Sequence, residues 1–247
     1  MKKRIYIWIL LISFPASIWS QQLPFFTQYM FNDYVINPAI AGTKDHYQAR
    51  AMSRFQWVGV IDAPQTISLS FNGPHAKKPM GFGGYLINDV TGPTSRTGFY
   101  GTYAYNFGLT EDIRLSLGLS FGILQNTIDG TKISLHDLND PALKEAISTS
   151  LVPDASLGAY VYHEKWFAGF SAFQLLSNNL KVYDEKNGLN RLKIHYYLVG
   201  GYRWAFAPDF TLEPSLIIKG MVNIPAQIDL NARIKFKETA WLGFSYR

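Results

Sequence analysis

Hydrophobic and polar residues alternate with a period of two along much of the chain. From Ile113 to Ile123 the odd positions carry Ile, Leu, Leu, Leu, Phe and Ile, and the even positions carry Arg, Ser, Gly, Ser and Gly. A second run, from Ala226 to Lys237, has Ile, Leu, Ile and Phe on one face and Gln, Asp, Asn, Arg, Lys and Lys on the other. Strict alternation predicts β-strands whose two faces meet different surroundings.

The polar face of the second run carries too many charges for the core of a β-sandwich. Burying unpaired charges in a dry interior is costly, so this face must meet water, a polar lumen or compensating charges. Aromatic residues make up 15% of the chain, which also contains 20 glycines, and these features fit a sheet with lipid on one face. The pattern therefore predicts an all-β fold, an antiparallel transmembrane β-barrel of the bacterial outer membrane.

Continuing this reading along the chain yields eleven strand candidates. They are residues 47–57, 64–72, 80–90, 95–107, 112–127, 154–162, 165–173, 192–206, 209–219, 225–237 and 240–247. Bacterial single-chain barrels close with an even number of strands, so we expect about 12 to 14 in the complete chain. Either the sequence is truncated after Arg247, or Gln21 to Tyr29 supplies another paired strand.

The connections between these strands alternate in length. Four are tight, at Leu109 to Glu111, His163-Glu164, Ala207-Pro208 and Glu238-Thr239, whereas residues 129–153 and 174–191 form long loops. Tight turns on the periplasmic side and long loops outside are typical of membrane barrels. Gly73 to Pro79 is longer than this rule predicts. Asp140 followed by Pro141 predicts one short helix, up to Ile147, in the first long loop.

The chain begins with the features of an export signal. Lys2, Lys3 and Arg4 precede an apolar stretch, Ile5 to Phe14, and small residues lie among Ala16 to Ser20. We expect residues 1–20 to be a signal peptide for the general secretory pathway and residues 21–247 to form a single barrel domain with an N-terminal segment, 21–45. Removing these three of the 23 basic residues leaves 20 against 18 acidic ones, which gives little support for binding nucleic acid.

Candidate chemistry is sparse, and the sequence predicts no enzyme, no cofactor and no metal site. The five histidines, His46, His75, His136, His163 and His195, lack the spacing of metal ligands on a helix, and cysteine is absent. The acidic residues between Asp137 and Asp140 lack the glycine and glutamate of a calcium loop. His195 is a formal candidate for a catalytic base, but its tyrosine-rich strand favours a place in an aromatic network.

Aromatic and amide or charged side chains interleave near the start of the mature chain. This mixture suits hydrogen-bonded packing at one end of a barrel, and it equally suits a contact with another protein. We therefore expect either a plug or a partner-binding site at Phe26, Gln28, Tyr29, Phe31, Asn32, Asn37, Pro38, Arg54, Gln56 and Trp57.

The same region carries a resemblance to a known family. FTQYMFN (Phe26 to Asn32) and INPAIAG (Ile36 to Gly42) resemble the opening signature of the PorP/SprF family of type IX secretion system outer-membrane proteins of the Bacteroidetes. The resemblance continues through RFQWVG, APQTISLSF, GFGGYLINDVTGP, DPAL and PDASLGAYVY, and it fades beyond about Trp204.

The resemblance implies a non-enzymatic barrel that works with the type IX machinery. It implies three kinds of partner: outer-membrane lipid, type IX secretion components, and a large secreted surface protein such as a gliding adhesin, through its C-terminal domain. The expected role is secretion or cell-surface anchoring of that cargo. The alternative is an outer-membrane channel or hydrophobic-substrate transporter, which an open pore would distinguish.

Overall fold

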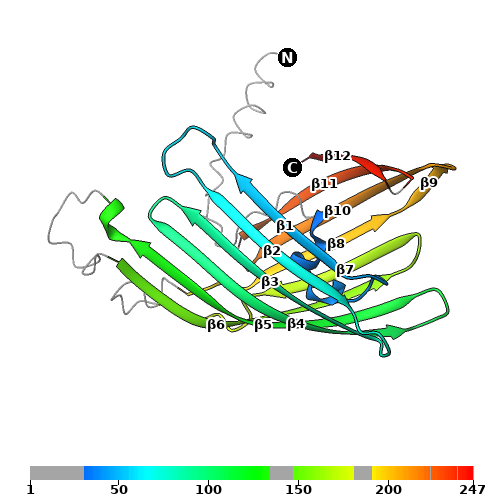
Figure 1. Ribbon diagram of the computed structural model, residues 1–247, viewed down its shortest axis with the longest axis horizontal. Coiled ribbons are helices and arrows are strands. Elements are labelled where there is room, and N and C mark those ends of the chain that lie inside the picture. The colour runs from blue at the N-terminus through cyan, green and yellow to red at the C-terminus, as the bar shows by residue number, and fades with distance from the viewer. Residues whose placement is uncertain (1–30, 134–146, 181–190, 223, 238, 247) are drawn as a thin grey trace, which may run out of the picture.

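The structure is a computed structural model, and it describes residues 31–133, 147–180, 191–222, 224–237 and 239–246. Twelve strands and three short 3-10 turns lie within these ranges (Figure 1). The strands are β1 (Gln48–Phe55), β2 (Gln65–Pro74), β3 (Met80–Thr91), β4 (Thr94–Gly108), β5 (Arg114–Asp129), β6 (Ile147–Tyr162), β7 (Trp166–Phe173), β8 (His195–Tyr202), β9 (Trp204–Ala207), β10 (Phe210–Met221), β11 (Ile224–Phe236) and β12 (Ala240–Tyr246). The turns are η2 (Asp33–Ile36), η3 (Pro38–Ile40) and η4 (Gly130–Lys132).

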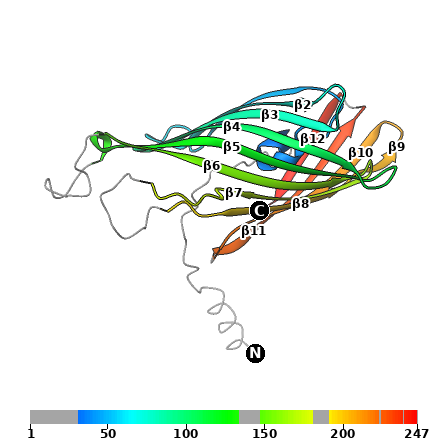
Figure 2. The same ribbon diagram turned by 90° about the horizontal axis from the view of Figure 1, so that it is seen from below.

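All twelve strands belong to one antiparallel sheet that curls around an interior (Figure 2). Neighbours in the sheet follow chain order from β1 to β8 and then β10 to β12, while the short β9 pairs with β10. Closure into a barrel requires the two edge strands to meet in register. Within the described residues β1 pairs only with β2 and β12 only with β11, so hydrogen bonds do not close the predicted barrel.

Two of the predicted strand boundaries are wrong. The candidate strand 192–206 is two strands, β8 and β9, and this division raises the count from eleven to twelve. The register places Pro214 of β10 opposite Tyr202, where the missing N–H interrupts the ladder. The candidate 154–162 begins earlier, because Ile147 to Pro153 pair residue by residue with the end of β5. The first long loop is correspondingly shorter than predicted.

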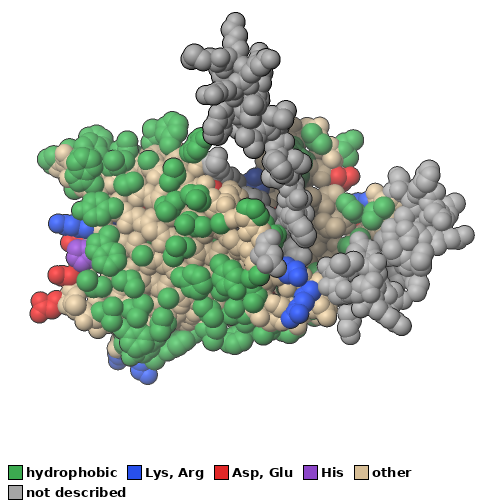
Figure 3. All heavy atoms as spheres, turned by 180° about the vertical axis from the view of Figure 1, so that it is seen from behind, with side chains coloured by type: hydrophobic (Ala, Val, Ile, Leu, Met, Phe, Trp, Pro, Cys, Tyr) green, Lys and Arg blue, Asp and Glu red, His purple; other side chains and the backbone are tan. Residues whose placement is uncertain are grey.

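The two faces of the sheet have the polarity that the alternation predicts. On β5, Leu117, Leu119 and Phe121 are 45%, 41% and 60% exposed, whereas Ser116 and Ser120 are at most 1% exposed. Figure 3 shows hydrophobic side chains spread over the outer surface. Large apolar residues face outward and small or polar residues face inward, the reverse of a water-soluble sheet.

The charged face of β11 turns toward the interior, as the sequence required. Asp229 is 1% exposed, and its carboxylate accepts a hydrogen bond of 2.6 Å from Lys219 Nζ on β10. Compensating charge from the neighbouring strand therefore stabilises an acid that would be costly to bury alone.

No helix in the described ranges is long and apolar enough to cross a membrane. The helix expected from Asp140 to Ile147 lies outside the described residues, apart from Ile147, which begins β6. Sequence reasoning did not anticipate the 3-10 turns η2 and η3, which lie in the hollow of the sheet (blue in Figure 2).

Candidate functional site

The N-terminal part of the described chain occupies the interior of the sheet, and we call residues 31–42 the inner segment. Tyr34 to Ala41 are all buried. Asn37 separates the two 3-10 turns, and its side-chain oxygen accepts a hydrogen bond of 3.0 Å from Ala39 N. Pro38 follows at the first position of η3. Asparagine as a cap and proline directly after it are the residues that start helical turns, so INPAIAG encodes this conformation locally.

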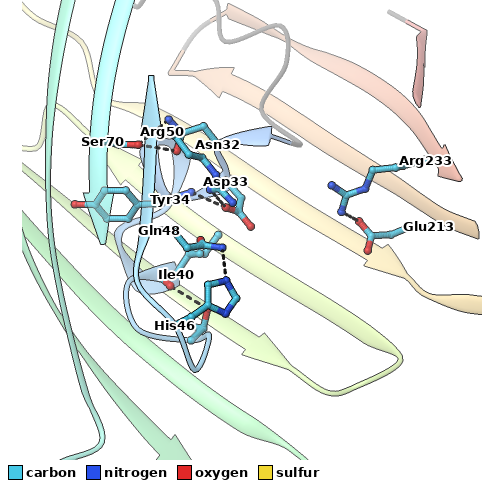
Figure 4. Close-up of polar contacts among 11 residues, drawn as sticks. Asn32, Asp33, Tyr34, Ile40, His46, Gln48, Arg50, Ser70, Glu213 and Arg233 are labelled. Carbon is cyan, nitrogen blue, oxygen red and sulfur yellow. Dashed lines mark hydrogen bonds and ion pairs between the residues drawn. The ribbon is translucent and has the colours of Figure 1, made fainter. Parts of the chain in front are cut away.

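Polar side chains attach the inner segment to several strands, among them β2, β4, β6 and β7. The Tyr34 hydroxyl donates to Thr102 Oγ1 of β4 at 2.7 Å, and Ser171 Oγ of β7 donates to Ile36 O at 2.6 Å. Asn37 Nδ2 donates to Ala159 O of β6 and Phe170 O of β7, at 3.1 and 3.3 Å. Asn32 Nδ2 donates to Ser70 Oγ of β2 at 2.9 Å (Figure 4). These contacts cross long stretches of sequence and place the inner segment in one position.

Glycines on the inward face of the sheet make room for the inner segment. A Cβ at Gly118 of β5 would lie 2.4 Å from Ala39 N, and a Cβ at Gly158 of β6 would lie 2.0 Å from Asn37 Oδ1. Neither distance is compatible with a side chain unless the inner segment moves. The small inward residues that the alternation revealed are therefore the surface on which the inner segment packs.

Apolar contacts complete this packing. The largest hydrophobic cluster joins five residues of the inner segment to tyrosines and aliphatic residues of β3, β4 and β6; its members are Tyr34, Val35, Ala39, Ile40, Ala41, Tyr85, Ile87, Tyr100, Ala104 and Tyr160. The core of this sheet is thus built around the inner segment, against which buried tyrosine and isoleucine side chains of β3, β4 and β6 pack.

A charged cluster lies beside the inner segment on the last strands. Glu213 of β10, whose side chain is 6% exposed, pairs with Arg203 at 3.1 Å, with Lys235 at 3.8 Å, and also with Arg233 of β11. The side chains of this cluster line a small cavity of about 50 Å³, and Asp33 lines it too. Asp33 pairs with Arg50 of β1 at 3.0 Å (Figure 4). Basic groups outnumber acidic ones in this part of the interior.

A second small cavity also borders the inner segment. It measures about 40 Å³ and is lined by Val35, Ile36, Tyr85, Ile87, Arg96, Tyr100, Leu124, Asp154, Phe173, Gln174 and Tyr197. Gln174 is 1% exposed with φ of +58°, and neither its amide nitrogen nor its amide oxygen has a hydrogen-bond partner within the described residues. A cavity of this size has room for about three water molecules.

The ten candidate residues fall into separate groups. Asn32, Asn37 and Pro38 are buried in the inner segment, and the Phe31 ring packs on Trp241 of β12 with centroids 4.1 Å apart. Arg54 lies on the inward face at the far end of β1, about 20 Å along the strand from Gln48 at 3.3 Å per residue. Gln56 and Trp57 follow in the loop. Phe26, Gln28 and Tyr29 lie outside the described residues.

Trp57 differs from the buried candidates in its surroundings. It is 65% exposed with φ of +52°, in a loop whose Val58, Val60 and Ile61 are also exposed. The structure therefore does not bring Arg54, Gln56 and Trp57 together with the inner segment. Sequence reasoning missed the residues that receive this segment, namely Ser70, Thr102, Gly118, Gly158 and Ser171. Their signal was the run of small residues at alternate positions.

The described residues contain no group of three His, Asp or Glu side chains positioned to hold a metal ion. His195 is 6% exposed, and its Nδ1 lies 2.8 Å from the carbonyl oxygen of Lys193. In the register of the sheet His195 lies opposite Phe173 of β7 and Met221 of β10, and the aromatic network stays a prediction.

The hydrogen bond between Tyr34 and Thr102 offers a direct test of the packing of the inner segment. Tyr34→Phe should lower the free energy of unfolding by about 1 kcal/mol, because one buried hydrogen bond is lost while Thr102 keeps its contact of 2.6 Å with Ser120. Urea unfolding followed by tryptophan fluorescence measures this change. Tyr103→Phe, on the outward face of the same strand, is the control and should leave stability unchanged; equal losses in the two variants would contradict the prediction.

Residues 18–247 match the family described as type IX secretion system membrane protein PorP/SprF. No curated protein matches the chain. The family match covers nearly the whole sequence, including the inner segment and every strand. The chain belongs to the PorP/SprF family of type IX secretion system membrane proteins.

Proposed function

We propose that the protein is a non-enzymatic outer-membrane component of the type IX secretion system that supports the secretion or cell-surface anchoring of one large cargo protein. Membership of a family of secretion-system membrane proteins supports the general role. The apolar outward face of the sheet and its polar inward face support a position in which the strands cross the outer membrane as a barrel.

The first twenty residues fit this placement. We propose that residues 1–20 are a signal peptide, removed after export through the general secretory pathway, and that residues 21–247 form one barrel domain. A positive start, an apolar stretch and small residues before Gln21 are the three parts of such a signal.

The observation that favours a cargo partner over a channel is the filled interior. Asn32, Tyr34 and Asn37 hydrogen-bond to the inward face, and Gly118 and Gly158 bring the strands into contact with this segment. A diffusion channel or a transporter of hydrophobic substrates needs an open path through the same space. A barrel whose interior is packed suits a role in which surfaces and loops bind another protein while the secretion machinery performs transport.

Deletion of the gene tests the cargo role. We expect loss of one surface protein, or a small set, from the outer surface, while other type IX substrates are secreted as before. Quantitative mass spectrometry of the surface and secreted fractions measures both groups. Reintroduction of the full chain should restore the missing protein. Unchanged surface and secreted proteomes, or the loss of every type IX substrate, would refute a cargo-specific role.

A further inference from the structure

A buried glutamine lines the cavity of about 40 Å³ that borders Val35 and Ile36, and we call this the Gln174 cavity. We propose that it is a binding site for a small uncharged ligand that carries a primary carboxamide group. Gln174 is 1% exposed, and neither atom of its amide has a hydrogen-bond partner within the described residues. A buried amide without partners is unfavourable, so native structures normally supply a partner to such a group.

The backbone holds Gln174 in an unfavourable conformation. Its φ of +58° lies in the left-handed region, which residues with long side chains rarely adopt. Leu175 N donates to Ala155 O at 3.0 Å, and Ser177 N donates to Gln174 O at 3.0 Å, so contacts on both sides fix this turn. Conformations of this kind persist where the surrounding structure enforces them, and they are concentrated at binding sites. The turn therefore fixes the side chain of Gln174 at the wall of the cavity.

Three other polar side chains of the lining can form further hydrogen bonds. Tyr100 Oη donates to Asp154 Oδ2 at 2.9 Å, and a carboxylate can accept several hydrogen bonds. Arg96 donates from Nε to Asn126 Oδ1 at 2.9 Å, and its other guanidinium N–H groups have no acceptor among the residues that the structure describes. The hydroxyl of Tyr197 has no partner in that part of the chain either. Both donors and acceptors are thus available to a ligand.

The charges of the lining favour a neutral ligand. The lining contains one basic and one acidic residue, Arg96 and Asp154, whose charges offset each other. A charged ligand would add an uncompensated charge to a buried site. A primary carboxamide is neutral, and its oxygen can accept from Arg96 or from the amide nitrogen of Gln174. Its N–H groups can donate to Asp154 or to the amide oxygen of Gln174.

The size and the apolar walls of the Gln174 cavity also fit such a group. Room for about three water molecules is similar to the space that the carbon, oxygen and nitrogen of one carboxamide need. Apolar side chains of the lining include Ile36, Ile87, Leu124 and Phe173. Ligand sites in proteins are typically apolar with a few placed polar groups. The carbon atoms of an amide ligand would contact these walls, where water finds no hydrogen-bond partner.

Affinity labelling tests the proposal on the full-length protein in mild detergent. Leu124 lines the cavity and is 2% exposed, and the chain has no cysteine, so Leu124→Cys places a single thiol in the lining. The probe is iodoacetamide, which is itself a primary carboxamide. The thiolate forms a bond to its CH₂ carbon, iodide leaves, and the thiol proton passes to the buffer. His75→Cys, in the exposed turn between β2 and β3, is the control.

We expect the labelling rate at Leu124→Cys to level off as the iodoacetamide concentration rises, because the reagent binds before it reacts. The rate at His75→Cys should stay proportional to the concentration. Acetamide at ten times its dissociation constant should slow labelling of Leu124→Cys by about tenfold, as mass action requires, and should not slow the control. Acetate carries a charge and N,N-dimethylacetamide lacks an N–H group, so neither should protect.

Two variants of the lining test the role of the polar groups. In the Leu124→Cys protein, Gln174→Leu should abolish both the saturation and the protection by acetamide. Tyr197→Phe removes only a hydroxyl and should weaken the protection; it carries the comparison if Gln174→Leu fails to give the folded band on unheated gels. Unchanged protection in both variants, when folded, would overturn the proposal.

The labelling kinetics can also contradict the proposal directly. A rate at Leu124→Cys that stays proportional to the iodoacetamide concentration, without protection by acetamide, would show that the cavity holds water only. Absence of labelling would show that the cavity admits no ligand. Equal protection by acetate, or equal protection of His75→Cys, would exclude a site that selects a neutral amide.

A capped glutamine, N-acetylglutamine methylamide, distinguishes two sources of the carboxamide. Protection by this probe would assign the group to a side chain of a polypeptide, and protection by acetamide alone would assign it to a free small molecule. Either result supports the site. The cargo role is independent of this site, and the deletion experiment tests it separately.

Discussion

Removal of residues 31–42 should open the interior of the sheet to water-soluble reagents. Ser120 on β5 is 1% exposed and touches Thr102, the residue that accepts the hydrogen bond of Tyr34. In a Ser120→Cys protein, the single thiol should react slowly with a charged maleimide because the inner segment covers it. Deletion of residues 31–42 in that protein should raise the labelling rate by about 100-fold or more, since exposure no longer requires a local opening of the structure.

A second reporter separates this effect from general unfolding. His75→Cys, in the exposed turn between β2 and β3, should react quickly with or without residues 31–42. Protection of the sheet from protease and the shift of the folded band on unheated gels establish that the strands remain assembled. Fast labelling of Ser120→Cys in the undeleted protein, or slow labelling after deletion from a folded protein, would contradict a filled interior.

A single substitution tests the same contact without removing any residue. Gly118→Val places a side chain where a Cβ alone would lie 2.4 Å from Ala39 N, so the inner segment must shift. We expect a loss of about 1 to 3 kcal/mol of stability, the usual cost of overpacking, together with faster labelling at Ser120→Cys. Gly101→Val is a matched control on the neighbouring strand, because a Cβ at Gly101 has no neighbour within 4 Å. Equal effects of the two substitutions would sink this interpretation.

Neutralising Glu213 should produce the largest loss of stability among single substitutions. Arg203, Arg233 and Lys235 all pair with this one buried carboxylate. Glu213→Gln leaves three basic groups close together in the interior without their acid, and breaking a buried ion pair in this way costs about 3 to 5 kcal/mol. Urea unfolding of the protein in detergent measures the change.

An exposed ion pair provides the comparison for Glu213. Asp209 lies 3.4 Å from Lys237, and both side chains are about half exposed. Asp209→Asn should lower stability by less than about 1 kcal/mol, because solvent already screens the pair. The double variant Glu213→Gln, Arg233→Gln should lose less than the two single variants together, since one uncompensated charge is removed with the acid. Similar losses for Glu213→Gln and Asp209→Asn would argue that the cluster does not stabilise the interior.

The positions of the strands could largely be predicted from the sequence, because alternation is a local property. Each residue of β5 and β11 reports by its own polarity which face it occupies, and the inward burial of Ser116 and Asp229 follows from that pattern. Alternation did not predict that the strand candidate divides at Arg203 into β8 and β9. This division depends on Pro214, a residue of the neighbouring strand that lies opposite Tyr202. The local pattern across residues 192–206 contains no sign of it.

The candidate site could be predicted only in part, because its contacts join residues that are far apart in the sequence. Asn37 and Pro38 carry a local signal for a turn, but the partners of the inner segment come from strands far away in sequence. Asn37 bonds to Ala159 and Phe170, more than 120 residues later in the chain. The aromatic side chain of Trp57 resembles those near the inner segment, yet Trp57 lies exposed in a loop. Composition identifies residues suited to a contact without identifying which of them meet.

The sequence by itself determined that this protein forms antiparallel strands with an apolar outward face and a polar inward one, and the residues of its opening motifs already carry its family resemblance. These properties reside in local patterns, where neighbouring residues suffice to specify the outcome. Only the tertiary structure decided that residues 31–42 fill the interior, that Glu213 gathers three basic side chains, and that β1 and β12 remain unpaired with each other within the described residues. Each of these depends on curvature and register accumulated over the whole sheet, which bring distant residues within bonding distance.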